Sequence, residues 1–156
     1  MKNNSCSIHF RIVVFAITIS IILFAFIHSS MPADISSDES ESVLGFLNNF
    51  LSLFGIGDDL TEHIIRKSAH FIEYTALGVM FALCAYSFNR SKPYKFFPNI
   101  IGAGILTAVI DETIQLNVEG RSGQISDVWL DFSGVLTGAV IMTLVFVIFK
   151  RIRKSD

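Results

Sequence analysis

The sequence predicts an all-α integral membrane protein with four transmembrane helices, and three observations support this fold class. Of the 156 residues, 51% are hydrophobic and only 17% are charged, whereas about 25% are charged in a typical soluble domain. Four apolar stretches are long enough to cross a bilayer, and basic residues gather at alternate ends of these stretches. The composition also excludes a disordered or fibrous chain.

The predicted spans cover residues 8–28, 69–88, 99–116 and 128–149. A transmembrane helix needs roughly 20 mostly apolar residues, and each stretch meets or nearly meets this length. The first stretch could instead be a cleaved signal peptide, but its apolar run of 16 residues is longer than usual and no small-residue cleavage site follows it. We therefore expect a single membrane domain over residues 1–156, with an outer loop at residues 29–68.

The basic residues predict the orientation of the chain. If both termini are cytoplasmic, nine of the 12 basic residues lie on the inner side: Lys2, Arg11, Arg90, Lys92, Lys95, Lys150, Arg151, Arg153 and Lys154. Since short inner loops are enriched in Lys and Arg, we expect a multi-pass protein of the cell membrane with cytoplasmic N and C termini. Cys6 and Cys84 then lie in or near the cytoplasm, so no disulfide is expected.

The outer loop contains a predicted amphipathic helix. The loop opens with a polar, acidic stretch at residues 34–41 and becomes apolar from Val43. Over residues 43–54 the apolar side chains recur at helical spacing, and polar side chains occupy much of the other face. We expect this helix to lie in the outer interface of the membrane, where it anchors the chain or helps to bind a lipid-like ligand. Residues 55–59 then end it.

Polar side chains gather toward the outer ends of the second, third and fourth spans. The predicted binding residues are Lys67, His70, Glu73, Asp111, Glu112, Gln115, Arg121 and Asp127. The second span runs inward and the third outward, so at 1.5 Å per residue these groups can all lie within about 10 Å of the outer interface. Because an ionisable group costs about 2.5–3.5 kcal/mol at the bilayer midplane, this shared depth predicts one functional polar layer made by three helices.

Small residues predict how these helices meet. Gly134 and Gly138 form a small-xxx-small motif that continues the stripe of Asp127 and Asp131 on the fourth span. Such motifs let two helix backbones approach closely. Their alignment with the acidic stripe favours carboxylates that face the interior of the bundle.

The polar layer offers groups for binding and for catalysis. Its candidate acids, bases or oxygen ligands for an ion are His70, Glu73, Asp111, Glu112 and Asp127. Lys67 and Arg121 could orient a phosphate or a carboxylate, and Gln115 could hold the ligand by hydrogen bonds. The alternative is that these groups pair with one another and only fix the register of the helices.

No resident cofactor is expected from the sequence alone, and a divalent metal ion is the less favoured alternative. His70 and Glu73 lack the H-E-x-x-H spacing of zinc enzymes. A lone histidine among carboxylates would suit Mg²⁺ or Mn²⁺ at least as well as zinc. Among the neighbouring residues, Tyr74 and Trp129 are interpreted as interfacial aromatic side chains and Arg66 as a solvated flank.

The motifs of the polar layer resemble those of the VanZ-like family of membrane proteins. The likeness comprises the stretch Lys67-Ser68-Ala69-His70-Phe71-Ile72-Glu73-Tyr74 with Leu77-Gly78, Asp111-Glu112 with Gln115, Gly120-Arg121, Asp127, and Gly134 with Gly138. It covers roughly residues 29–149. The family pattern usually has Asn where this chain has Asp131. The resemblance implies a four-span protein associated with low-level resistance to the glycopeptide teicoplanin, but it implies no established reaction.

Two classes of function remain open from the sequence. The protein could be an enzyme that acts on a lipid-linked cell-wall precursor, or a binding protein for a membrane lipid, a lipid-linked envelope intermediate or a glycopeptide antibiotic. A transporter is less favoured because the charges lie on one side of the membrane and offer no path across it. Nucleic acid is not an expected partner, since the basic residues mark the topology rather than a binding patch. The sequence does not predict the oligomeric state.

Overall fold

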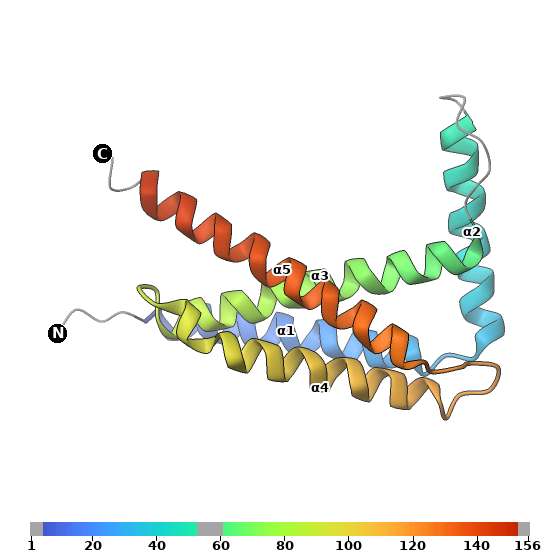
Figure 1. Ribbon diagram of the computed structural model, residues 1–156, viewed down its shortest axis with the longest axis horizontal. Coiled ribbons are helices and arrows are strands. Elements are labelled where there is room, and N and C mark those ends of the chain that lie inside the picture. The colour runs from blue at the N-terminus through green and yellow to red at the C-terminus, as the bar shows by residue number, and fades with distance from the viewer. Residues whose placement is uncertain (1–4, 53–60, 153–156) are drawn as a thin grey trace.

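The computed structural model describes residues 5–52 and 61–152 as a bundle of helices (Figure 1). The helices are α1 (Ile8–Ser29), α2 (Ala33–Ser52), α3 (Glu62–Phe88), α4 (Phe97–Gln115) and α5 (Ile125–Ile152), and the short 3₁₀ helix η1 (Pro93–Phe96) precedes α4. Within the described residues, α1, α3, α5 and η1 together with α4 are long and apolar enough to cross a membrane. The all-α fold class with four transmembrane helices is therefore confirmed.

All four spans extend beyond a predicted limit, α1 by a single residue at its end. Helix α3 begins seven residues earlier than predicted, at Glu62, because Thr61 caps it: the Thr61 hydroxyl accepts a hydrogen bond of 3.3 Å from the N–H of Ile64. Helix α5 gains three residues at each end, and α4 begins two residues earlier. At 1.5 Å per residue α3 is about 40 Å long, so it projects beyond the hydrocarbon core of about 30 Å.

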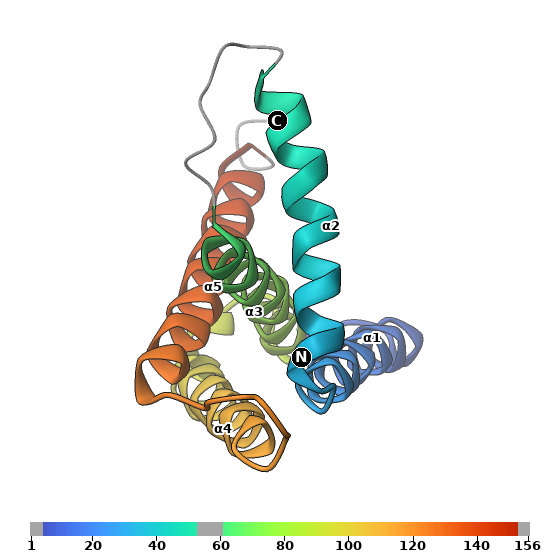
Figure 2. The same ribbon diagram turned by 90° about the vertical axis from the view of Figure 1, so that its right-hand side faces the viewer.

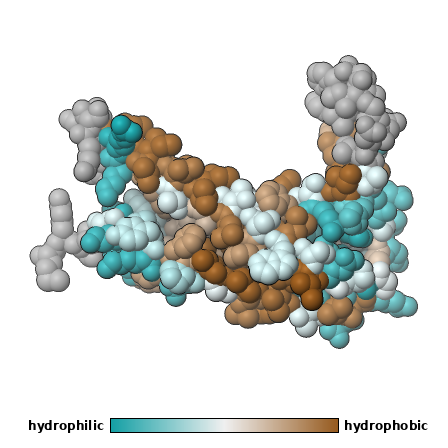
Figure 3. All heavy atoms as spheres, in the orientation of Figure 1, coloured by the Kyte–Doolittle hydropathy of each residue, from teal (hydrophilic) through white to brown (hydrophobic). Residues whose placement is uncertain are grey.

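Helix α3 is the central helix of the bundle and contacts α1, α4 and α5 (Figures 1 and 2). Its Tyr74 and Leu77 form the core with Ala108 of α4 and with Val135 and Ala139 of α5, all of which are buried. Large apolar side chains of all four spans remain exposed on the outside of the bundle. On the face in Figure 3, hydrophobic side chains cover the middle of the bundle and hydrophilic ones gather toward its two ends. This distribution is the one that a membrane-spanning bundle needs.

Glycines allow α3 and α5 to approach backbone to backbone. A Cβ atom at Gly134 would lie 2.7 Å from the carbonyl oxygen of Phe71, and a Cβ atom at Gly138 would collide with the carbonyl oxygen of Thr75. Gly78 of α3 meets the backbone of Val135 in the same way. The predicted role of the glycine motif in close helix packing is confirmed.

Helix α2 runs across the bundle axis rather than along it (Figures 1 and 2), which is the direction expected of a helix in the membrane interface. It begins at Ala33, so the prediction of a helix from Val43 alone was too short: the acidic stretch is helical as well. Asp34 lies in the first turn, where a negative charge favours the helix dipole. Phe46 is 70% exposed and is thus available to contact lipid. The predicted end of the helix at residues 55–59 lies outside the described residues.

Candidate functional site

The predicted site residues meet at one end of the bundle, where α1 and α4 end and α3 and α5 begin (Figure 1). This end lies opposite the one at which α1 begins and α5 ends. The helix directions follow from the alternating spans, and they bring polar groups that are distant in the sequence to the same depth. The predicted polar layer is therefore a single region of the structure.

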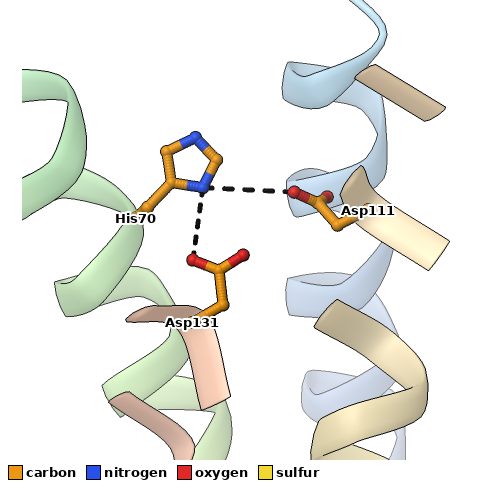
Figure 4. A group of neighbouring side chains, drawn as sticks. All are labelled: His70, Asp111 and Asp131. Carbon is orange, nitrogen blue, oxygen red and sulfur yellow. Dashed lines mark ion pairs between the residues drawn. The ribbon is translucent and has the colours of Figure 1, made fainter. Parts of the chain in front are cut away.

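A trio of side chains lies at the centre of this region: the partly buried His70 of α3 and the buried Asp111 of α4 and Asp131 of α5 (Figure 4). The Nδ1 atom of His70 is 3.5 Å from an oxygen of Asp131 and 4.0 Å from an oxygen of Asp111. Both aspartate side chains are 0% exposed, and the histidine side chain is 12% exposed. These separations exceed the 2.7–3.2 Å of a usual N–H···O hydrogen bond, so the trio is close-packed but loosely bonded.

A hydrogen-bond network fixes one side of Asp111. Its Oδ2 atom accepts hydrogen bonds from the hydroxyl of Ser29 at 2.8 Å and from the side-chain amide of Gln115 at 3.2 Å. The same amide of Gln115 donates to Glu112 at 3.2 Å, and the second oxygen of Glu112 accepts from the backbone N–H of Gln124 at 2.9 Å. The network links α1, α4 and the loop before α5. Three of its members are buried: Asp111, Glu112 and Gln115.

The two predicted anion-binding residues have different surroundings. Lys67 forms an ion pair of 2.7 Å with Asp127, and both side chains are partly exposed at 33% and 23%. Arg121 donates hydrogen bonds to the backbone carbonyls of Met31 at 3.2 Å and His28 at 3.1 Å. Arg121 therefore holds the end of α1 against the loop between α4 and α5, in addition to any role toward a ligand.

The remaining residues of the second span lie deeper. Glu73 is partly buried one turn beyond His70, and within the described chain its Oε1 atom has no hydrogen-bond partner. Tyr74 is 0% exposed and belongs to the core between α3 and its neighbours. The interpretation of Tyr74 as an interfacial aromatic is therefore wrong, because the close α3–α5 contact covers this face of α3. Trp129, in contrast, is 62% exposed on the outside of α5.

A polar pocket of about 90 Å³ opens beside the trio. Its lining includes five basic or imidazole side chains and two carboxylates: His63, Arg66, Lys67, His70, Arg121, Glu112 and Asp127. Five of the eight predicted site residues are in this set, and Gln115 also lines the pocket. The pocket thus presents more positive than negative groups and suits a small anionic group.

An apolar groove of about 400 Å³ lies between α4 and α5 next to this pocket. Its walls are mainly aliphatic and aromatic, with Val109 on α4 and Val128, Trp129 and Phe132 on α5. Glu112 and Gln124 line both the groove and the polar pocket. The two cavities therefore adjoin, and together they offer a polar end and an apolar end to one ligand.

Sequence reasoning missed two members of the site. Ser29 brings the first span into a layer that was predicted to involve only three helices; a serine at a helix end gives no signal that distinguishes it from others. Asp131 was expected to face the interior of the bundle together with Asp127, four residues before it on the same helical face, but it was not counted among the predicted binding residues. The structure places its carboxylate 3.5 Å from His70.

The fold and the site define a four-span membrane protein with a polar cluster and an adjoining apolar groove at one end of its bundle. The family model described as VanZ/LLP1 matches residues 13–148, which is most of the chain, so the protein belongs to this family. The predicted membership of the VanZ-like family is thereby confirmed. No curated protein matches the chain, and no solved structure does.

Proposed function

We propose that this protein binds an amphiphilic molecule of the cell envelope at the polar pocket and the apolar groove. The observation that carries the proposal is that the two cavities share Glu112 and Gln124. A ligand with an anionic head group and an apolar chain fits this pair of cavities. Lipid-linked cell-wall intermediates and lipid-bearing glycopeptides both have this chemistry.

The head group would be held in the polar pocket. Lys67 is the basic side chain best suited to this role, since it lines the pocket and is partly exposed. Its partner Asp127 keeps the ammonium group in place at 2.7 Å. A phosphate or carboxylate oxygen arriving in the pocket would share this ammonium group with Asp127 and gain a charge-assisted hydrogen bond.

The apolar chain would lie in the groove between α4 and α5. Trp129 and Val109 are 62% and 44% exposed and line the groove from opposite helices. In a bilayer this groove faces the lipid, so an acyl or prenyl chain can enter it sideways without leaving the hydrocarbon region. Such a site distinguishes ligands that carry an apolar chain from ligands that lack one, because the polar pocket by itself is small.

The site end of the bundle is proposed to face the outside of the cell. Among the described residues, most of the lysines and arginines lie at the opposite end, and such residues favour the cytoplasmic side. A site in the outer leaflet would meet envelope intermediates where they are used. Teicoplanin carries an acyl tail and vancomycin does not, so we expect binding to change susceptibility to teicoplanin selectively.

The test is drug susceptibility of a sensitive Gram-positive host that expresses the protein and its variants at equal membrane abundance. We expect the wild type to protect against teicoplanin and not against vancomycin. Lys67→Met, which removes the head-group cation, and Val109→Trp, which fills the groove, should both abolish protection. The matched controls are Lys95→Met and Val147→Trp, which make the same changes at exposed positions outside both cavities.

Binding by purified protein provides the second measurement. Lys67→Met should weaken binding of the tailed ligand about tenfold, the loss of roughly 1.4 kcal/mol that one charge-assisted hydrogen bond contributes. Full protection by both site variants, or equal binding of teicoplanin and vancomycin, would contradict the proposal. Catalysis remains the alternative function: His70 and Glu112 line the pocket, and conversion of a bound lipid-linked precursor by the wild type would establish it.

A further inference from the structure

The hydrogen-bond network of the polar layer leaves several buried oxygen atoms without a donor. Among the described residues, Oδ1 of Asp111 and both carboxylate oxygens of Asp131 have no hydrogen-bond partner. Both side chains are 0% exposed. Figure 4 shows the Asp131 carboxylate directed at the space beside His70, with Asp111 across from it. A purely structural role does not account for these atoms, since structural polar groups in an apolar interior are normally satisfied.

The charges of the trio indicate that it lacks positive charge. Two carboxylates face one imidazole, and a protonated imidazole could balance only one of them. Buried, unpaired carboxylates are costly in a low-dielectric interior. A divalent cation would balance both carboxylates and could be bound by the imidazole in its neutral form.

We propose that His70, Asp111 and Asp131 bind one divalent transition-metal ion. The three side chains offer ligand atoms that all lie within 4.8 Å of one another, and they come from three different helices. Ligands of a single ion with bonds of about 2.0–2.2 Å are separated by roughly 3–4 Å, so the side chains need to move inward by less than about 1 Å. The sequence left Mg²⁺ open as well, but in this trio one of the three ligand atoms is an imidazole nitrogen. Such a set suits Zn²⁺ or Mn²⁺ better than Mg²⁺, which prefers oxygen ligands.

The surroundings of Asp111 support this assignment. Ser29 and Gln115 both donate to its Oδ2 atom, so the orientation of the carboxylate is held while Oδ1 has no donor. Ligating carboxylates in metal sites are commonly oriented by such second hydrogen bonds. Three protein ligands also leave a coordination position for water or for an oxygen of a bound molecule. The site does not depend on the proposed function of the neighbouring cavities.

The experiment measures metal binding to the full-length protein, purified in detergent after removal of any histidine tag and treated with a chelator. The probes are Zn²⁺, Mn²⁺ and Mg²⁺ alone, with bound metal counted by mass spectrometry and affinity taken from calorimetry. We expect one Zn²⁺ or Mn²⁺ per chain and an affinity for Mg²⁺ that is weaker by about 100-fold or more. Co²⁺ should give the visible absorption spectrum of a nitrogen- and oxygen-coordinated ion.

The variants decide whether the trio is the site. Asp131→Asn and His70→Ala should each lower the affinity about 100-fold, and Ser29→Ala about tenfold, because it only orients a ligand. Asp38→Asn removes an exposed carboxylate of α2 and should change nothing. Circular dichroism and size-exclusion chromatography confirm that each variant is folded. The proposal is overturned if the folded wild type binds none of the added metal ions, or if the Asp131→Asn variant binds metal as tightly as the wild type.

Discussion

Ser29 connects the first helix to the polar layer through a single hydroxyl. Its hydrogen bond to Asp111 is 2.8 Å long, and Ser29 is 2% exposed. The next residue, Ser30, is exposed and donates instead to the carbonyl of Phe26 within its own helix. Two adjacent serines thus have different roles, because the last turn of α1 directs only one of them toward α4.

This difference predicts unequal effects of removing the two hydroxyls. Ser29→Ala should lower the free energy of unfolding by about 0.5–1.5 kcal/mol, the range of hydrogen bonds between helices in membranes. Ser30→Ala should leave it nearly unchanged, since no contact between helices is lost. Unfolding in mixed detergent micelles, followed by circular dichroism, provides the measurement. Equal stability of the Ser29→Ala variant and the wild type would show that the bond contributes nothing.

At the scale of helices, the contact between α3 and α5 sets the geometry of the site. Gly134 and Gly138 allow the two backbones to touch, and this approach places Asp131 opposite His70. A bulkier residue at either glycine would push the helices apart just below the polar layer. The geometry of the site therefore depends on the glycine packing motif.

A pair of glycine substitutions tests this link. Gly138→Ala should destabilise the protein by about 2 kcal/mol or more, because the new methyl group collides with the α3 backbone. Gly102→Ala is the matched control: apart from its chain neighbours and the backbone of its own helix, no atom lies within 4 Å of the added methyl group, and alanine is the better helix former. We expect its melting temperature to stay constant or to rise. If both variants have the same melting temperature as the wild type, the close contact of α3 and α5 is not required for stability.

The ends of the helices show where sequence patterns reach their limit. Apolar stretches located the spans, because a bilayer demands a minimum apolar length. The polar first turn of α3 and the acidic first half of α2 carry no such signal, although Thr61 and Asp34 favour helix starts at these places. The predicted boundaries were consequently too short at both helix starts.

At the scale of the whole molecule, the proposed orientation can be tested with two exposed serines at opposite ends of the bundle. Ser122 lies in the loop between α4 and α5, and Ser91 lies between α3 and η1. In a background with Cys6 and Cys84 replaced by serine, Ser122→Cys should react with a membrane-impermeant thiol reagent in intact cells. Ser91→Cys should react only after permeabilisation. The reverse pattern would place the polar pocket in the cytoplasm.

The sequence by itself determined the class of protein, the four spans and the depth of the polar layer. These properties depend on composition and on distance along a helix, and both can be counted from the residues. Helix direction then places His70 and Asp111 at the same level without any knowledge of packing.

Only the tertiary structure decided which of these groups meet. Rotation of one helix against another is set by contacts between backbones, as at Gly138, and this rotation brings Asp131 to His70 and Lys67 to Asp127. The contribution of Ser29 and the junction of the polar pocket with the apolar groove arise in the same way. Periodicity along one helix says which residues share a face, but the partner of that face depends on how all the helices pack together.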